Sequence, residues 1–144
     1  MRTATRVLVP LLLAGSAFAG ERNPPQIDYM LQCQGCHRAD GTGAPDQGVP
    51  ALKDSIARFV AVPGGREYLV RVPGASSSPL SDAELAAVRN WMIVSYGPAE
   101  QAEGFDPYTE EEVAAVRRPP LARVYELRQS LLERFEAASR QTAN

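Results

Sequence analysis

Residues that commonly carry metal or acid–base chemistry are scarce in this chain. Its 144 residues include one histidine, His37, two cysteines, Cys33 and Cys36, and one lysine, Lys53. A structural zinc site takes four ligands, usually from two separated pairs, so the lack of a second pair argues against structural zinc. With a single histidine and no legible pair of catalytic carboxylates, the chain also lacks the groups of an acid–base active site.

An excess of basic residues is missing too. The chain has 15 Lys and Arg against 17 Asp and Glu, a formal net charge of −2. Its arginines are scattered along the sequence and do not form a basic run. A nucleic-acid partner requires a concentrated positive surface, so we expect no nucleic-acid binding.

No apolar run is long enough to cross a membrane. The longest such stretch near the N-terminus, 7–19, has 13 residues and contains Pro10, whereas a spanning helix needs about 20. Arg2 and Arg6 precede it and the small residues Ala17-Phe18-Ala19 end it, so 1–19 is predicted to be a secretory signal peptide. The processed chain is then a periplasmic protein that does not span the membrane. Its 13 basic and 17 acidic residues give a formal charge of −4.

Export sets a condition on the two cysteines. Outside the cytoplasm free thiols meet oxidising conditions, where they are expected to pair, to bind a metal or to be alkylated. Both thiols therefore need a role.

Alternating apolar runs and internal repeats are absent, and the patterns that recur are helical. The strongest helix covers 81–97, where Ser81 and Glu84 form a capping box and Gly97 ends the helix. We predict an all-α fold with loops over 37–50 and 74–80. The other expected helices run from Asn23-Pro24-Pro25 into Cys33 and end by Gly35, cover 51–60 and 66–72, and start at Thr109 and at Pro119-Pro120.

The chain divides by composition into three parts. After the signal peptide at 1–19, residues 20–97 are predicted to form one domain and residues 98–144 a linker with a helical C-terminal extension. Apolar residues recur in the extension at spacings of three and four, which is typical of an amphipathic helix. This stripe either packs back on the domain, the interpretation we favour, or docks on a partner; its members are Val124, Leu127, Leu131 and Phe135.

The two cysteines and the histidine form one group, Cys33-Gln34-Gly35-Cys36-His37. A thioredoxin-like redox pair needs a βαβ setting, which the surrounding helices do not provide. A plain disulfide leaves the adjacent histidine unexplained. Covalent attachment of haem uses every member, because two thiols at i and i+3 add to the vinyl groups of the macrocycle and the next residue gives the iron an imidazole.

The chain resembles the class I cytochrome c family from Pro24 to Gly97. The matching pieces are the helix into "CQGCH", the loop "RADGTGAPDQGVPAL" and the helix "LSDAELAAVRNWMI". The resemblance implies an all-α fold around one covalent haem c, in which Trp91 packs where the first and last core helices cross.

The same resemblance implies a role for each residue of the site. Cys33 and Cys36 carry the thioether bonds, and His37 is the proximal iron ligand. The carbonyl of Pro50 holds the other imidazole nitrogen, a contact that fixes the ring and raises its basicity.

One family feature is missing. Class I cytochromes usually take the sixth iron ligand from a methionine in the loop before the last helix, but residues 71–82 contain none. Met92, on the helix face of Leu85, is one candidate, and Lys53 and a serine from 76–78 are weaker ones. Met30 and Met92 are expected to pack in the core. We therefore expect an open, water-bound or weakly ligated iron.

These features predict an electron carrier and not an enzyme. The chain is expected to pass single electrons between a dehydrogenase or other redox donor and an acceptor, docking transiently on a dehydrogenase- or oxidase-type partner. An open iron leaves an alternative, a haem-based binder of small ligands such as NO or CO, or a peroxidase-like protein. A third possibility is a cytochrome subunit of a larger oxidoreductase that docks through the C-terminal stripe.

Overall fold

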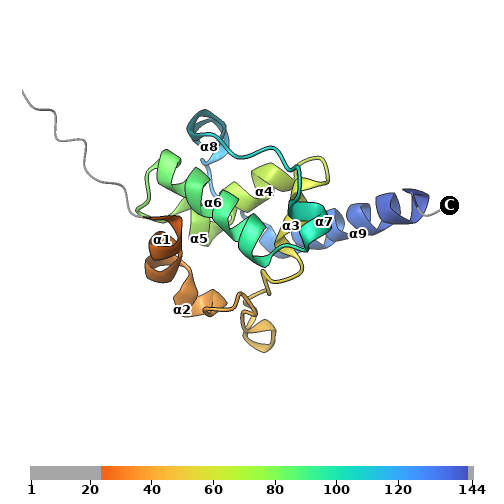
Figure 1. The fold of residues 1–144 in the computed structure, drawn as a ribbon, viewed down its shortest axis with the longest axis horizontal. Coiled ribbons are helices and arrows are strands. Elements are labelled where there is room, and N and C mark those ends of the chain that lie inside the picture. Colours follow the sequence, from red (N-terminus) through yellow and green to blue (C-terminus); the bar gives the residue numbers. More distant parts are fainter. Residues whose placement is uncertain (1–23, 143–144) are drawn as a thin grey trace, which may run out of the picture.

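The computed structural model describes residues 24–142, so the predicted signal peptide lies outside the described part. Those residues form helices and no strand, apart from one isolated bridge between Ala44 and Val49. The all-α prediction is therefore confirmed (Figure 1). The helices are α1 (Pro25–Gln32), α2 (Gln34–His37), the 3₁₀ turn η1 (Pro45–Gln47), α3 (Ile56–Val60), α4 (Gly65–Arg71), α5 (Pro73–Ser76), α6 (Asp82–Tyr96), α7 (Ala99–Ala102), α8 (Glu110–Val116) and α9 (Val124–Thr142).

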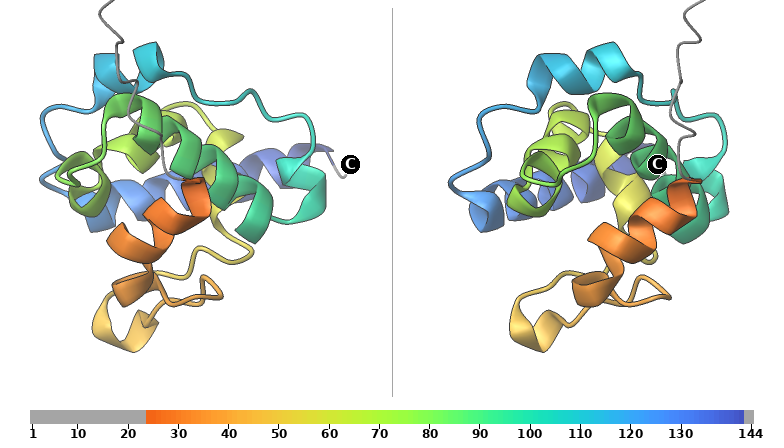
Figure 2. Two further views of the ribbon diagram at one scale, coloured as in Figure 1. Left: turned by 60° about the vertical axis from the view of Figure 1, so that its left-hand side comes forward. Right: turned by 90° about the vertical axis from the view of Figure 1, so that its left-hand side faces the viewer.

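Helix α6 is the centre of the fold. It begins with the predicted capping box, in which the Glu84 amide donates to Ser81 Oγ at 3.2 Å and the Ser81 amide donates to the Glu84 carboxylate at 2.7 Å. Helix α1 lies across α6 in both views of Figure 2. One face of α6 is buried, and its members include Leu85, Val88, Met92 and Ile93.

Three aromatic rings fill the crossing of α1 and α6. Tyr29 lies 5.2 Å from Trp91 and 5.3 Å from Tyr96 between ring centroids. Each tyrosine also reaches the loop after α2, because Tyr29 donates to the Arg38 carbonyl at 2.6 Å and Tyr96 to the Ala39 carbonyl at 2.9 Å. Since buried hydroxyl groups need partners, these bonds tie the loop to the helix crossing.

The C-terminal segment contributes to the core. Helix α8 packs on α6, and α9 packs on α3 and α4. Tyr108, Val113 and Leu131 are buried at 4%, 0% and 1% exposure. The rest of the predicted apolar stripe packs partly buried against the same core, so this stripe faces its own chain; its members there are Val124, Leu127 and Phe135.

Helix α9 begins later than predicted. The sequence placed its start at Pro119-Pro120, but the helix starts at Val124. The preceding segment bonds to α4 instead, since the Leu121 amide donates to the Arg71 carbonyl at 3.0 Å and Arg71 Nε donates to the Pro119 carbonyl at 2.9 Å. A tertiary contact thus holds this segment out of the helix.

Short helices also occupy segments that were predicted to lack them. Helix α5 overlaps the start of the loop that was predicted over 74–80, and Pro73 supplies a preset φ at its first helical position. Helix α7 lies in the predicted linker. Helix α2 continues past Gly35 to His37, although the helix was expected to end by Gly35.

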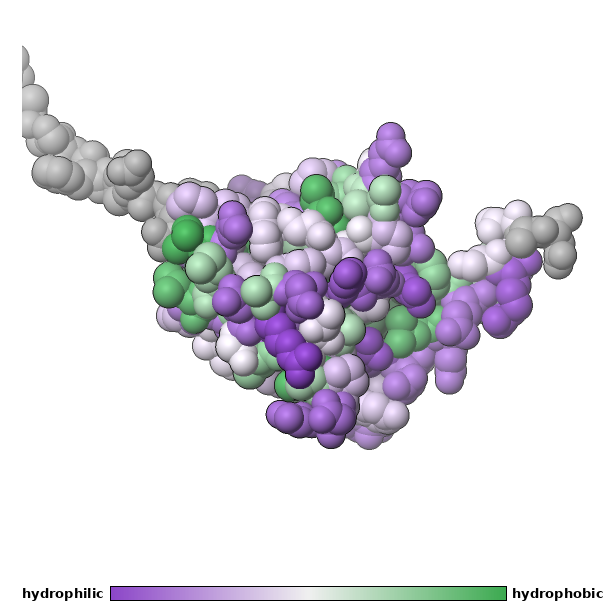
Figure 3. Space-filling view, turned by 60° about the horizontal axis from the view of Figure 1, so that its bottom comes forward, coloured by the Kyte–Doolittle hydropathy of each residue, from purple (hydrophilic) through white to green (hydrophobic). Residues whose placement is uncertain are grey.

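Met30 is not a core residue, which corrects the prediction. Its side chain is 49% exposed. Tyr29 faces α6, and the next helical position is rotated by about 100°, which turns Met30 outward. Figure 3 shows apolar atoms in green beside the grey N-terminal trace, at the α1 end of the molecule. The exposed apolar side chains of α1 are Ile27, Met30 and Leu31.

None of the helices in residues 24–142 combines the length and the apolar character that a membrane crossing demands.

Candidate functional site

One helical turn carries the cysteines and the histidine. The Cys36 and His37 amides donate to the Cys33 carbonyl at 3.2 and 2.9 Å. Cys33 is half-buried and Cys36 is exposed, and the two sulfurs are not bonded to each other. The turn follows directly on α1, so the crossing of α1 and α6 sets its position.

The imidazole of His37 is fixed by a backbone carbonyl. Nδ1 lies 3.1 Å from the carbonyl oxygen of Pro50, the contact that the family resemblance implied. With the proton on Nδ1 donated to this carbonyl, the lone pair of Nε2 is available to a metal. Burial lowers the pKa of His37, and the nearby Arg89 lowers it further, while the bond to Pro50 opposes the shift. A neutral imidazole, the form that binds iron, is therefore favoured.

The loop between His37 and Pro50 depends on Gly43. This residue has φ +65°, and a Cβ there would lie 2.6 Å from the Pro50 carbonyl oxygen. Its amide donates to the His37 carbonyl at 3.0 Å. A side chain would displace the carbonyl that orients the imidazole, so glycine is required by close approach as well as by φ.

The thiols and the imidazole line the wall of one cavity. It holds about 1010 Å³ of space between atoms, part of it open to solvent. Most of the lining is apolar and comes from seven helices, the loop after α2 and the loop ahead of α6. A flat, mainly apolar macrocycle fits such a lining, because the groups that would attach it lie on one wall. The other lining residues include Leu52, Ile56, Phe59, Tyr68, Leu69, Val72, Leu80, Leu85, Arg89, Met92, Val124 and Arg128.

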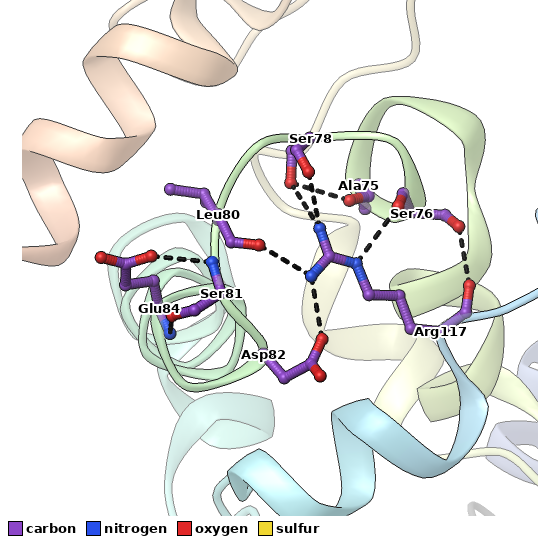
Figure 4. Close-up of polar contacts among 8 residues, drawn as sticks. All are labelled: Ala75, Ser76, Ser78, Leu80, Ser81, Asp82, Glu84 and Arg117. Carbon is purple, nitrogen blue, oxygen red and sulfur yellow. Dashed lines mark hydrogen bonds and ion pairs between the residues drawn. The ribbon is translucent and has the colours of Figure 1, made fainter.

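The segment that would carry the usual methionine is held by Arg117. This side chain is 8% exposed. Its guanidinium donates to the carbonyls of Ser76, Ser78 and Leu80 at 3.1, 2.7 and 2.7 Å, and to Asp82 Oδ1 at 2.8 Å (Figure 4). The C-terminal segment thus fixes the shape of the loop ahead of α6.

Two of the three serines in 76–78 already have partners, and the third, Ser77, is exposed and does not line the cavity. Ser76 Oγ donates to the Arg117 carbonyl at 2.7 Å, and Ser78 Oγ donates to the Ala75 carbonyl at 2.9 Å. Lys53, the other weak candidate for an iron ligand, is exposed and does not line the cavity.

Met92 lines the cavity and is 1% exposed. Its sulfur accepts a hydrogen bond from Arg89 Nη1, at 3.5 Å. Arg89 lies one turn after Leu85, and this guanidinium lines the same cavity. The spacing of Leu85, Arg89 and Met92 along one helix face was the signal from which Arg89 could have been found in the sequence.

Other lining residues could not be found that way. Val124 and Arg128 belong to α9, which the sequence assigned to an extension outside the domain. Arg128 lies over the ring of Phe59, 5.7 Å from its centroid. Tyr68 also stacks on Phe59, with the two ring centroids 5.0 Å apart. These contacts depend on the packing of α9 and α4.

Within residues 24–142 no three or more His, Cys, Asp or Glu side chains gather in a way that could hold a metal ion directly.

A helical chain around an apolar cavity, with a C-x-x-C-H turn on the cavity wall, has the fold and the site of a c-type cytochrome. No family model matches the chain. It is similar to a cytochrome c-552 of Thermus thermophilus, at 34% identity over 134 residues that cover 81% of this chain and 88% of that protein. A second Thermus thermophilus cytochrome c-552 is 37% identical over 108 residues, which cover 62% of this chain and 82% of that protein. The chain belongs to the cytochrome c family.

Membership sets the general function. The protein is a c-type cytochrome, an electron carrier whose cofactor is covalently bound haem c. As an electron carrier it works with a redox partner.

Proposed function

We propose that this cytochrome holds its haem through thioether bonds to Cys33 and Cys36, with His37 as the proximal iron ligand. The observation that carries the proposal is the shared cavity wall, where both thiols and the imidazole lie within one helical turn. The Pro50 carbonyl holds the imidazole by Nδ1. When bound, haem c supplies reversible one-electron exchange at its iron. The chain's own residues bind the macrocycle, orient the imidazole and exclude water.

We further propose that the sixth iron position is open, water-bound or weakly ligated. The loop ahead of α6 has no methionine, Ser76 and Ser78 are engaged with Arg117 and Ala75, and Ser77 does not line the cavity. Met92 has the one thioether that lines the cavity within residues 24–142, and it is the candidate ligand from the sequence. Its sulfur already accepts from Arg89, which disfavours a bond to iron.

Two measurements on purified protein test these proposals. The double serine variant of Cys33 and Cys36 should lose covalent haem, and each single variant should hold haem loosely or lose it. Full covalent haem in the double variant would contradict the attachment. Optical spectra of the oxidised and reduced protein should show a high-spin component that shifts with CO. A long-wavelength band typical of methionine ligation, with no CO response, would overturn the open site. The variant Met92→Leu would then show whether Met92 is the ligand.

A second function is favoured by the same site. An iron without a strong sixth ligand binds small molecules such as NO, CO or peroxide, so the protein can also be a ligand binder or a peroxidase-like protein. Turnover of peroxide with a reducing dye distinguishes this from electron carriage alone. Absence of peroxide turnover in protein that still transfers electrons would leave the carrier function only.

The setting we propose is the periplasm, after cleavage of the signal peptide at Ala19. The partner is a dehydrogenase or other donor on one side and an acceptor such as an oxidase on the other. N-terminal sequencing of the exported protein tests the cleavage, and an intact Met1 would contradict it. A stable complex through the C-terminal stripe is disfavoured, because Leu131 and its neighbours pack on the chain's own core. Genome context and co-purification test the partner.

A further inference from the structure

Arg89 is a buried cation on the wall of the haem cavity. Its side chain is 6% exposed, and it extends from the middle of α6. Nη1 donates to the Met92 sulfur at 3.5 Å, and Nε has no hydrogen-bond partner. A buried guanidinium normally has a carboxylate partner, because an unpaired buried charge is costly. Arg89 takes part in none of the ion pairs found among residues 24–142.

The groups that face Arg89 from other elements are neutral. They are the sulfur of Cys33 at the end of α1, the imidazole of His37, the Tyr68 hydroxyl of α4 and the Tyr108 hydroxyl before α8. Burial raises the pKa of both tyrosines, so both stay protonated at neutral pH, and Cys33 is neutral as a thioether. The buried carboxylate of α1, Asp28, has an Oδ2 without a partner and does not pair with Arg89.

The guanidinium itself stays charged. Burial lowers the pKa of Arg89. The ordinary pKa of arginine is so far above neutral that the guanidinium keeps its proton inside proteins, where a lysine would lose it. No carboxylate among residues 24–142 forms an ion pair with this positive charge, which lies next to the same space that His37, Cys33 and Cys36 line.

We propose that Arg89 raises the reduction potential of the haem iron by holding its positive charge on the cavity wall. The inference rests on the proposed attachment of haem in this cavity. Oxidation removes an electron and adds one positive charge to the iron complex. A fixed positive charge in a low-dielectric wall opposes that change and favours the ferrous state. The bond to Met92 keeps the guanidinium at the wall.

Spectroelectrochemical titration of the holoprotein tests the inference. At a fixed applied potential and neutral pH, Arg89→Gln should have a ratio of reduced to oxidised protein at least tenfold below that of the unmodified chain. For one electron, a tenfold change corresponds to about 59 mV. The matched control is Arg134→Gln, on the exposed side of α9, where solvent screens the charge. Its ratio should change less than twofold.

A second variant, Arg89→Met, is used if the Arg89→Gln protein does not fold. It removes the charge and leaves an apolar side chain that suits the cavity, so the fold is retained, and the same tenfold fall in the ratio is expected. Either variant with covalent haem and a ratio within twofold of the unmodified protein overturns the role of Arg89. A new axial-ligand spectrum in the variant would assign the shift to Met92 released from Arg89, and would also overturn it.

A measurement of covalently bound haem distinguishes the role of Arg89 from the proposed attachment through Cys33 and Cys36. Retention of haem after acid–acetone extraction reports on Cys33 and Cys36 and is expected in every Arg89 variant. Loss of covalent haem in the unmodified protein would refute the proposed attachment. A potential that does not depend on Arg89, in protein that keeps its haem, would refute only the present inference.

Discussion

Ser76 and Arg117, 41 residues apart in the sequence, are joined by a reciprocal pair of hydrogen bonds. Ser76 Oγ donates to the Arg117 carbonyl at 2.7 Å, and Arg117 Nε donates to the Ser76 carbonyl at 3.1 Å. The same guanidinium satisfies two further carbonyls, at Ser78 and Leu80. The loop ahead of α6 is thus shaped by the C-terminal segment, in a protein in which no methionine of that loop can anchor it to iron.

Removal of Arg117 should therefore be strongly destabilising. Arg117→Ala leaves three carbonyls of the loop without their donor, and buried polar groups without partners are costly. We expect a loss of about 3 kcal/mol in the free energy of unfolding, measured by urea denaturation of the holoprotein. Arg118→Ala, at the exposed next position, is the control and should cost less than about 0.5 kcal/mol. Equal costs for the two variants would contradict a specific role for Arg117.

The anchoring of α9 gives a second prediction. Leu131 is 1% exposed and fixes α9 on the core. Leu131→Ala removes buried methyl groups and leaves a cavity, so the free energy of unfolding should fall by about 3 kcal/mol. Leu31→Ala, at a side chain that is 66% exposed, should change it by less than about 0.5 kcal/mol. If α9 is dispensable for stability, thermal denaturation will give the same midpoint for both variants.

The sequence predicts local features of this fold well. The capping box of Ser81 and Glu84 and the helix stop at Gly97 depend on neighbouring residues, and local patterns carry that information. The burial of Leu85, Val88 and Met92 follows from helical spacing. Arg89 shares that face and could have been included, although a charged residue at a core position is an exception to the pattern.

The long-range contacts could not be predicted from the sequence. The Arg117 network joins groups 35 to 41 residues apart, and Val124 and Arg128 reach the cavity only because α9 folds back on α3 and α4. The start of α9 was wrong for the same reason, since the bond of the Leu121 amide to Arg71 decides where the helix begins. A single sequence does not contain the pairing of distant segments.

The junction of α3 and α4 gives a third prediction. A Cβ at Gly65 would lie 1.8 Å from the Phe59 carbonyl oxygen, so Gly65→Ala must separate the two helices. Overpacking of this kind costs about 3 kcal/mol, to be measured by thermal or urea unfolding. Gly35→Ala is the control, because no atom lies within 4 Å of its Cβ position. Alanine in that helix should gain about 0.5 to 1 kcal/mol, and a gain at Gly65 as well would refute the close approach.

The pH dependence of stability gives a fourth prediction, at Tyr108. This side chain is 4% exposed and donates to the Arg66 carbonyl at 3.1 Å. Burial raises the pKa of Tyr108 well above its ordinary value of 10.0. In the unfolded chain this tyrosine ionises near pH 10, whereas in the folded chain it stays protonated. The folded state then binds more protons, so stability is fully present below pH 10 and falls as the pH rises above it.

The variant Tyr108→Phe isolates the part of the stability loss at high pH that the ionisation of Tyr108 causes. From Tyr108 alone, the free energy of unfolding should fall by about 1.4 kcal/mol between pH 9 and pH 11, and the phenylalanine variant should lack this part of the fall. At pH 7 the variant should be less stable by about 1 kcal/mol, because it loses the bond to Arg66. Tyr125→Phe, at a side chain 71% exposed, should leave the fall unchanged. Urea unfolding followed by circular dichroism at each pH measures the stability of the unmodified protein and of both variants. If the free energy of unfolding of Tyr108→Phe falls between pH 9 and pH 11 as much as that of the unmodified protein, the burial of Tyr108 does not cause the loss of stability at high pH.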